Sequence, residues 1–271
     1  MILFVGHGSR VAEGNEELLR FTEKLSHFMD VPTETCFLEL APPGIPEGID
    51  RCVKQGAARI TVIPLMLFAA GHAKVHIPLA IREAQTKYPH VRFRYGRPVE
   101  VDETVLDILA ERVRGIKADD ETAVLIVGRG SSDRCANSDL YKLARMFWER
   151  TRLKWVEVSF VGVTDPPLDS GIERCVRLGA RKIVVLPYFL FTGILIRRIS
   201  EKVNQFQEQH PDLKVQLCPY LGADDSLLPI IRNRVQEVEQ GAGVSWEKLA
   251  EKALAAGYHH HDHSHSHHHH D

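Results

Sequence analysis

The chain has 271 residues, which is enough for one large domain or for two smaller ones. Hydrophobic residues make up 44% and charged residues 26%, close to the averages of globular proteins, so disorder is excluded for the bulk of the chain. The net charge of -2 gives no basic surface for a polyanion, and we therefore exclude nucleic acid as a main partner.

Short β-branched runs alternate along the chain with longer stretches of helical periodicity, which is the pattern of an α/β fold with parallel sheets. Helices are expected between the strands, and a further short helix is expected near residues 245–255. That helix either caps a lobe or only leads into the C-terminal tail. The strands are predicted at residues 2–5, 35–39, 59–64 and 91–95, and again at 124–127, 157–161, 182–187 and 214–218.

The N-terminus lacks the basic region and cleavage site of a secretory signal. The apolar stretches at residues 60–71 and 183–196 each contain a proline and are shorter than the roughly 18–20 residues of a membrane span. We therefore expect a cytoplasmic protein outside the membrane. The five cysteines include no C-x-x-C pair and are widely spaced, so they are interpreted as thiols rather than as disulfides or a zinc site.

The chain contains an internal repeat. Residues 48–68 and 171–191 are identical at 12 of 21 aligned positions, at an offset of 123. Within one residue, the same offset aligns Val-Gly-His-Gly-Ser at residues 5–9 with Val-Gly-Arg-Gly-Ser at 127–131. A constant offset over separate segments indicates duplication. We predict a first lobe at residues 1–118, a second lobe at 119–240, and a C-terminal segment at 241–271.

Three potential metal ligands follow strands of the first lobe: His7 after the first strand, Glu39 at the end of the second, and His72 after the third. Parallel strands bring their carboxyl ends together at one edge of the sheet. Two imidazoles and a carboxylate suit a divalent ion such as Co²⁺, Fe²⁺, Ni²⁺ or Zn²⁺, and three protein ligands leave coordination positions open for exchange. The second lobe has Arg129, Gly162 and Leu195 at the matching positions, so we expect one active and one degenerate lobe.

Two loops near these ligands have alternative interpretations. The glycines of Gly6-His7-Gly8 allow backbone amides to approach an anion, although tight turns use glycine for other reasons. A histidine phosphatase is disfavoured, because Gly6 rather than an arginine precedes His7. His76 lies four residues after His72, but Pro78 disfavours a helix before Ile77. We therefore favour His72 as the ligand and place His76 around the site or on the surface.

The tail from Tyr258 to Asp271 contains nine of the fifteen histidines. Its low complexity predicts disorder without metal. Interruptions by Asp and Ser argue against a purification tag, and we expect a native tail that collects divalent metal.

Together these residues resemble the class II chelatases of tetrapyrrole synthesis, specifically the sirohydrochlorin chelatases. The resemblance covers nearly the whole chain. It is carried by Val-Gly-His-Gly-Ser-Arg at 5–10, Phe-Leu-Glu-Leu at 37–40, Pro-Leu-Met-Leu at 64–67, His-Ala-Lys at 72–74, Ile-Pro at 77–78 and Gly-Arg-Gly-Ser-Ser at 128–132. It implies two tandem flavodoxin-like lobes with a cleft between them, and it suggests a monomer because the lobes are fused.

The resemblance further implies that His7 and His72 bind the metal and remove pyrrole protons, with Glu39 completing the site. It implies Co²⁺ insertion into sirohydrochlorin for cobalamin, or Fe²⁺ insertion for sirohaem; the tail favours cobalt. The metal, Co²⁺, Fe²⁺ or Ni²⁺, is then a substrate, and no organic cofactor is expected. The expected contacts to substrate carboxylates are Ser9, Arg10, Lys74, Arg129 and Ser131. The alternative of another class is a metal chaperone or store without chemistry.

Overall fold

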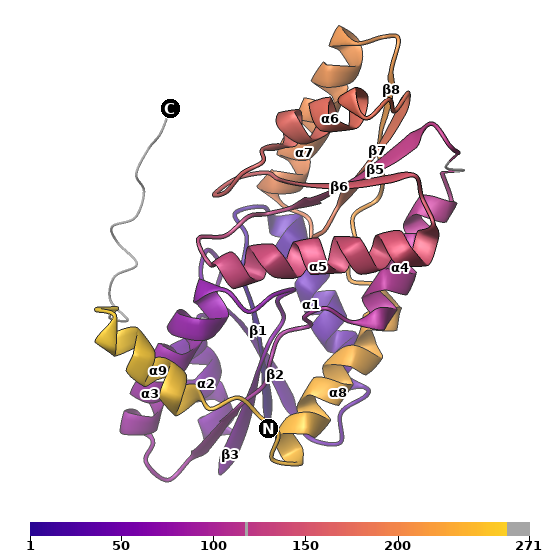
Figure 1. Ribbon diagram of the computed structural model, residues 1–271. Helices are drawn as coiled ribbons and strands as arrows, with labels where there is room; N and C mark the ends of the chain where they lie inside the picture. The colour runs from indigo at the N-terminus through magenta and orange to yellow at the C-terminus, as the bar shows by residue number, and fades with distance from the viewer. Residues whose placement is uncertain (117–118, 259–271) are drawn as a thin grey trace.

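The computed structural model describes residues 1–116 and 119–258, so the histidine-rich tail from residue 259 and the predicted lobe boundary at 117–118 lie outside the described residues. Two parallel sheets lie one beyond the other along the molecule (Figure 1). In chain order the elements are β1 (Ile2–Gly6), α1 (Ala12–Ser26), β2 (Thr33–Phe37), α2 (Ile45–Lys54), β3 (Arg59–Pro64), the π-helical turn η1 (His72–His76), α3 (Ile77–Lys87), β4 (Arg92–Tyr95), α4 (Glu103–Arg114), β5 (Thr122–Gly128), α5 (Arg134–Thr151), β6 (Trp155–Phe160), α6 (Leu168–Arg177), β7 (Lys182–Pro187), α7 (Ile194–Gln209), β8 (Lys214–Leu217), the 3₁₀ turn η2 (Asp225–Leu227), α8 (Leu228–Glu239) and α9 (Trp246–Ala255).

The two sheets have the same topology, with strand orders β2-β1-β3-β4 and β6-β5-β7-β8 and parallel pairing throughout. The predicted α/β class and parallel sheets are confirmed. The register repeats as well, because Gly6 pairs with Phe37 in the first sheet and Gly128 pairs with Phe160 in the second. The observed β3 and β7 have the predicted bounds. The prediction for β2 was wrong by two residues, because the strand ends at Phe37 and leaves Glu39 in the following turn. The predicted starts of β5 and β6 were also wrong, each two residues too late.

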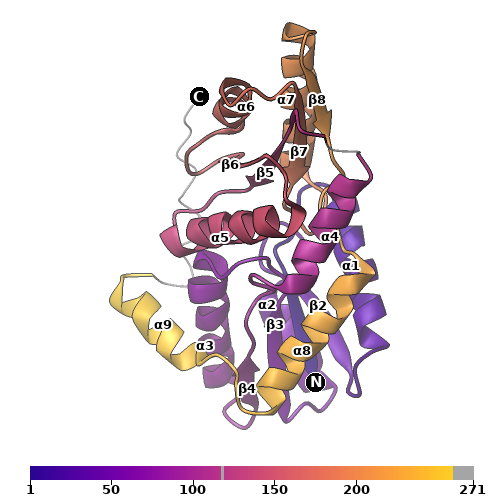
Figure 2. The ribbon, with the colours of Figure 1, turned by 45° about the vertical axis from the view of Figure 1, so that its right-hand side comes forward.

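Helices cross between the two sheets (Figures 1 and 2). α4 follows the last strand of the first sheet but packs against α5 and β7 of the second. α8 follows the second sheet but returns to pack against α1 and β3, and α9 packs against α3 and η1. The predicted lobe ranges follow the sequence repeat, whereas packing groups α4 with the second sheet and α8 with the first. The helix near residues 245–255 therefore covers the first lobe.

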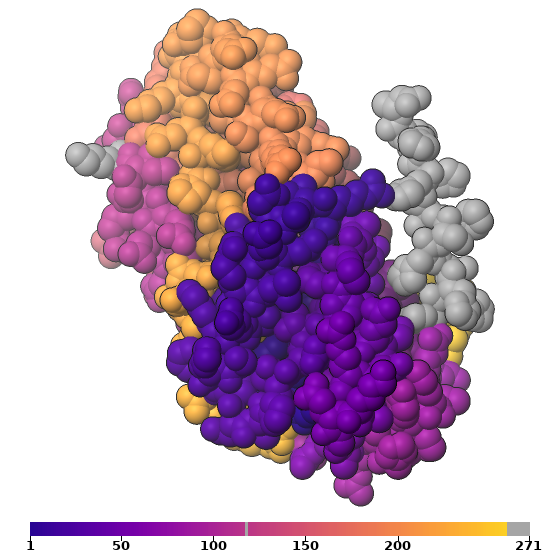
Figure 3. Space-filling model, turned by 180° about the vertical axis from the view of Figure 1, so that it is seen from behind, coloured from indigo at the N-terminus to yellow at the C-terminus, as the bar shows by residue number. Residues whose placement is uncertain are grey.

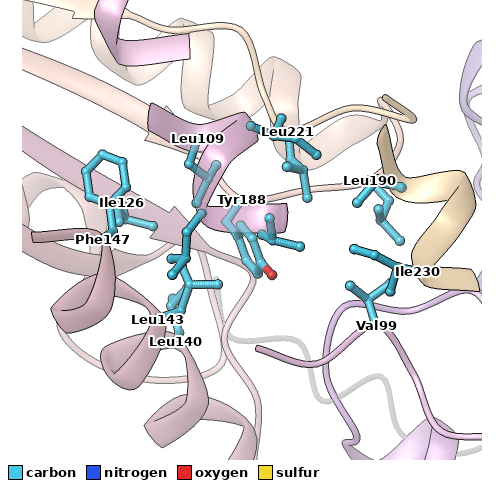
Figure 4. Packing of buried hydrophobic residues seen from close by; sticks show 14 of the residues in the cluster. Val99, Leu109, Ile126, Leu140, Leu143, Phe147, Tyr188, Leu190, Leu221 and Ile230 are labelled. Atoms are coloured by element: carbon cyan, nitrogen blue, oxygen red, sulfur yellow. The ribbon is translucent and has the colours of Figure 1, made fainter. Parts of the chain in front are cut away.

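Buried residues join the two lobes. One hydrophobic cluster contains Phe4 and Phe21 from the first lobe, Val99 from the crossover before α4, and Phe147 from the second lobe. Figure 4 shows Val99 and Ile230 of α8 facing Leu190. The continuous cluster fixes how the two strand-end edges face each other.

Polar contacts hold the lobes together at their margins. Arg234 of α8, 5% exposed, donates through Nε to the Pro98 carbonyl at 3.0 Å and through Nη2 to the Val99 carbonyl at 2.7 Å. The N-terminal part of the chain also abuts the second lobe (Figure 3). There Glu17 of α1 accepts hydrogen bonds from the Thr192 amide at 2.8 Å and from the Tyr220 hydroxyl at 2.7 Å. Within the described ranges, no helix has both the length and the apolar character needed to cross a bilayer.

Candidate metal centre

His7 and Glu39 are held side by side by backbone bonds that continue beyond the strand ends. The Leu38 amide donates to the Gly6 carbonyl at 2.8 Å, and the Glu39 amide donates to the His7 carbonyl at 3.1 Å. Gly8 makes this approach possible. Its φ is +88°, and a Cβ atom there would lie 1.8 Å from the Glu39 carbonyl oxygen. Gly8 is therefore required so that its loop can pack against the Glu39 turn. This role differs from the anion binding by backbone amides that the sequence suggested.

His72 begins the π-helical turn η1, so the prediction of no helix before Ile77 was wrong. The Ile77 amide bonds to the His72 carbonyl across the wide turn. Pro78 has no N–H, so it cannot donate to the carbonyl of Ala73, five residues before it. The buried Tyr95 hydroxyl donates to this carbonyl at 2.8 Å. The helical backbone thus tolerates Pro78, and His72 and His76 lie on one face.

The three predicted ligands converge. His7 Nε2 lies 3.1 Å from His72 Nε2 and 3.5 Å from Glu39 Oε1. One ligand atom from each of the three residues lies within 4.8 Å of the other two. The side chains of His7 and Glu39 are 31% and 34% exposed, so the group is reachable from outside. Separations of about 3 Å between nitrogen and oxygen donors suit one ion with bonds of about 2 Å.

The hydrogen bonds of the two rings leave Nε2 facing the centre. His7 Nδ1 lies 3.1 Å from the Gly8 carbonyl, which assigns the hydrogen to Nδ1 and the lone pair to Nε2. His72 Nδ1 lies 2.9 Å from His76 Nδ1, so His76 orients the His72 ring. Burial and then the positive charge of Arg129 lower the pKa of His7, while the Gly8 carbonyl and Glu39 oppose them. His7 is therefore neutral near pH 7, the form that binds metal.

The second lobe presents Arg129 to this group. Its Nη1 lies 2.9 Å from His7 Nε2, so the counterpart of His7 in the repeat contacts His7 itself. The Gly162 amide bonds to the Arg129 carbonyl at 3.1 Å, just as the Glu39 amide bonds to that of His7. This equivalence supports the alignment made from the sequence. Leu195 lies in the first turn of α7. Arg129 donates to the lone pair that a metal would use, so the two compete for one atom.

The five residues predicted to meet substrate carboxylates have different surroundings. Arg10 is exposed, and Lys74 pairs across the lobes with Asp133, with 2.5 Å between Nζ and Oδ2. Ser9 holds its own loop: its amide donates to Asn15 Oδ1 at 2.8 Å, and its hydroxyl accepts from the Val11 amide.

Ser131 repeats this turn in the second lobe. Its amide donates to Asn137 Oδ1 at 3.0 Å, and its hydroxyl accepts from the Asp133 amide at 3.0 Å. The sequence reasoning missed both asparagines and Asp133. The signal was present, because an asparagine follows the serine by six residues in each copy.

Known proteins resemble this chain over nearly its whole length. The CbiX family model matches twice, at residues 1–116 and 123–238. The chain is 49% identical over 245 residues to the sirohydrochlorin cobaltochelatase of Priestia megaterium, covering 89% of this chain and 80% of that protein. It is 38% identical to the sirohydrochlorin ferrochelatase of the same organism over 249 residues, covering 91% and 93% respectively.

The fold has a counterpart among solved structures. The crystal structure of the sirohydrochlorin chelatase SirB from Bacillus subtilis subspecies spizizenii in complex with cobalt aligns with a TM-score of 0.75 and 34% identity, covering 89% of this chain and 95% of that one. The similarity therefore spans both lobes of a metal-binding relative.

Proposed function

Because the chain belongs to the CbiX family, we propose that it is a sirohydrochlorin chelatase that inserts Co²⁺ into the tetrapyrrole and releases two protons. The observation that carries this function is the convergence of His7, Glu39 and His72 at the edge facing the second lobe. Cobalt is preferred over iron because the cobaltochelatase relative is 49% identical and the ferrochelatase relative 38%.

The three side chains divide the work. His7 and His72 bind the incoming ion through Nε2, and Glu39 adds a carboxylate that balances part of its charge. Metal insertion replaces two pyrrole N–H bonds by bonds to the metal, so two protons must leave. An imidazole that has passed its metal to the ring has a free nitrogen lone pair, with which it can accept one of these protons.

Substrate carboxylates would be met by cations around this group. Arg10 is exposed and available, whereas Lys74 and Arg129 are paired with Asp133 and His7. Each cation has further N–H donors beside the one in this contact, so a carboxylate can bind Lys74 or Arg129 next to the existing partner. Ser9 and Ser131 support this surface by holding the two loops in shape.

The test is an anaerobic absorbance time course of sirohydrochlorin with Co²⁺, run beside Fe²⁺ and beside metal without protein. We expect protein-dependent metallation and a higher kcat/KM for Co²⁺. His7→Ala and His72→Ala, each with the tail intact, remove a metal-binding and proton-accepting group. Each should lower kcat/KM for Co²⁺ at least about 100-fold. The matched control is His90→Ala, which removes an exposed histidine after α3 and should retain full activity.

The outcomes separate the chelatase from a metal store. A store would bind Co²⁺ through the tail and accelerate nothing. Wild-type turnover in His7→Ala would show that the three-ligand group is not the reaction centre. Deletion of the tail should raise only the Co²⁺ concentration at which metallation reaches half its maximal rate, because the proposed centre lies within the lobes.

A further inference from the structure

Two apolar side chains stand exposed in strained turns, one in each lobe. Leu40 is 50% exposed with φ of +63°, and Val163 is 69% exposed with φ of +68°. Each is the central residue of a three-residue turn: the Ala41 amide bonds to the Glu39 carbonyl at 2.8 Å, and the Thr164 amide bonds to the Gly162 carbonyl at 2.8 Å. A γ-turn of this hand is rare and strained, and a β-branched residue there is an outlier.

Neither turn needs an apolar side chain for folding. Glycine or asparagine would adopt a positive φ with less strain, and an exposed leucine or valine adds little to a core. The second lobe has nevertheless kept the turn and the apolar residue although it has glycine where the first lobe has Glu39. Strain that persists beside a functional group indicates a role in binding.

Both turns lie beside the residues of the proposed metal centre. Leu40 directly follows the ligand Glu39, and Val163 follows Gly162, whose amide bonds to the Arg129 carbonyl. Arg129 in turn contacts His7. For metal transfer the ring nitrogens of a tetrapyrrole must come within about 2 Å of the ion, so the ring has to cover the residues that adjoin the ligands.

We infer that Leu40 and Val163 form an apolar clamp, one residue from each lobe, that contacts the flat apolar ring of the tetrapyrrole. The inference rests on the proposed function and adds the residues that recognise the ring itself. The cations described above would meet carboxylates at the ring edge, and the clamp would meet its face. The strained turns hold each side chain out from the surface, where no neighbouring side chain shields it fully.

Leu40→Asn and Val163→Asn test the clamp, because asparagine suits a positive φ and removes the apolar contact. Both variants should keep or raise the melting temperature and should bind Co²⁺ as the wild type does. Losing a half-buried apolar contact should weaken equilibrium binding of metal-free sirohydrochlorin, and raise its KM, about fivefold to thirtyfold. The matched control is Leu178→Asn, an apolar residue 45% exposed at the end of α6, which should change neither value.

The outcomes distinguish this inference from the proposed function. Unchanged sirohydrochlorin binding in both variants overturns the clamp, as does a change confined to oligomeric state in sedimentation, which would indicate a surface for a second copy. If the wild type binds sirohydrochlorin without metallating it and Leu40→Asn weakens that binding, the clamp stands and the chelatase function falls.

Discussion

Gly8→Ala tests whether the close packing of two loops builds the metal centre. At φ of +88° an alanine carries a strain of about 1–2 kcal/mol. Its Cβ would lie 1.8 Å from the Glu39 carbonyl oxygen, so the Glu39 turn has to move, which costs a further 1–3 kcal/mol or so. The sum of about 2–5 kcal/mol corresponds to a fall in melting temperature of roughly 4–9 °C for a chain of this size.

Gly130→Ala in the second lobe is the matched control. Its φ is +87°, and its Cβ would lie 1.9 Å from the Gly162 carbonyl oxygen, so the loss of stability should be similar. Only Gly8→Ala displaces a proposed ligand. Calorimetry and Co²⁺ titration, in a full-length background with the tail histidines replaced by serine, should show two comparably destabilised proteins of which only Gly8→Ala binds Co²⁺ more weakly. Equal Co²⁺ affinity in the two variants would refute the reasoning.

Three further changes test neighbouring contacts. Arg129→Gln removes the donor that competes with metal for His7, and in the same background Co²⁺ should bind about tenfold more tightly; weaker binding would contradict the competition. His76→Ala should lower kcat because the ring it orients is released, and His76→Asn should restore part of it; equal rates in the two would argue against orientation. Burial alone would raise the pKa of Asp133, but the hydrogen bond from Lys74 and those from backbone amides outweigh it. The pKa of Asp133 is therefore below that of a free aspartic acid. The resulting stability is present at neutral pH and is lost as the pH falls through that lowered pKa. Asp133→Asn should therefore cost about 1 kcal/mol at pH 7 and nothing at the acid end of a thermal-unfolding series; a constant difference would show that the ion pair is not its source.

The buried strands were the easiest part of the fold to predict. β3 and β7 have the predicted bounds because central parallel strands are apolar on both faces. β5 is central and buried as well, but it begins at Thr122, two residues before its predicted start. β2 is an edge strand with polar positions, and its predicted end was displaced by two residues. The three candidate ligands could be named because strand ends meet at one edge, and because the second copy of the repeat has other residues at the matching positions.

Other features depend on contacts between distant residues and leave little trace in local sequence. The π-helical turn before Pro78 needs the Tyr95 hydroxyl to satisfy the Ala73 carbonyl, a partner far along the chain. The role of Gly8 depends on the path of the Glu39 turn. The crossing of α4 and α8 could not be inferred from a repeat, because periodicity identifies a helix but not the sheet on which it packs.

Because α4 and α8 cross between the sheets, neither repeat alone contains all the helices that cover its own sheet. A fragment ended at the repeat boundary would carry α4 away from the second sheet, and it would leave α1 and β3 without the helix that covers them. Each fragment would therefore expose an apolar face whose natural cover belongs to the other. The two repeats therefore exchange helices, and each sheet has its full cover only when both repeats are present.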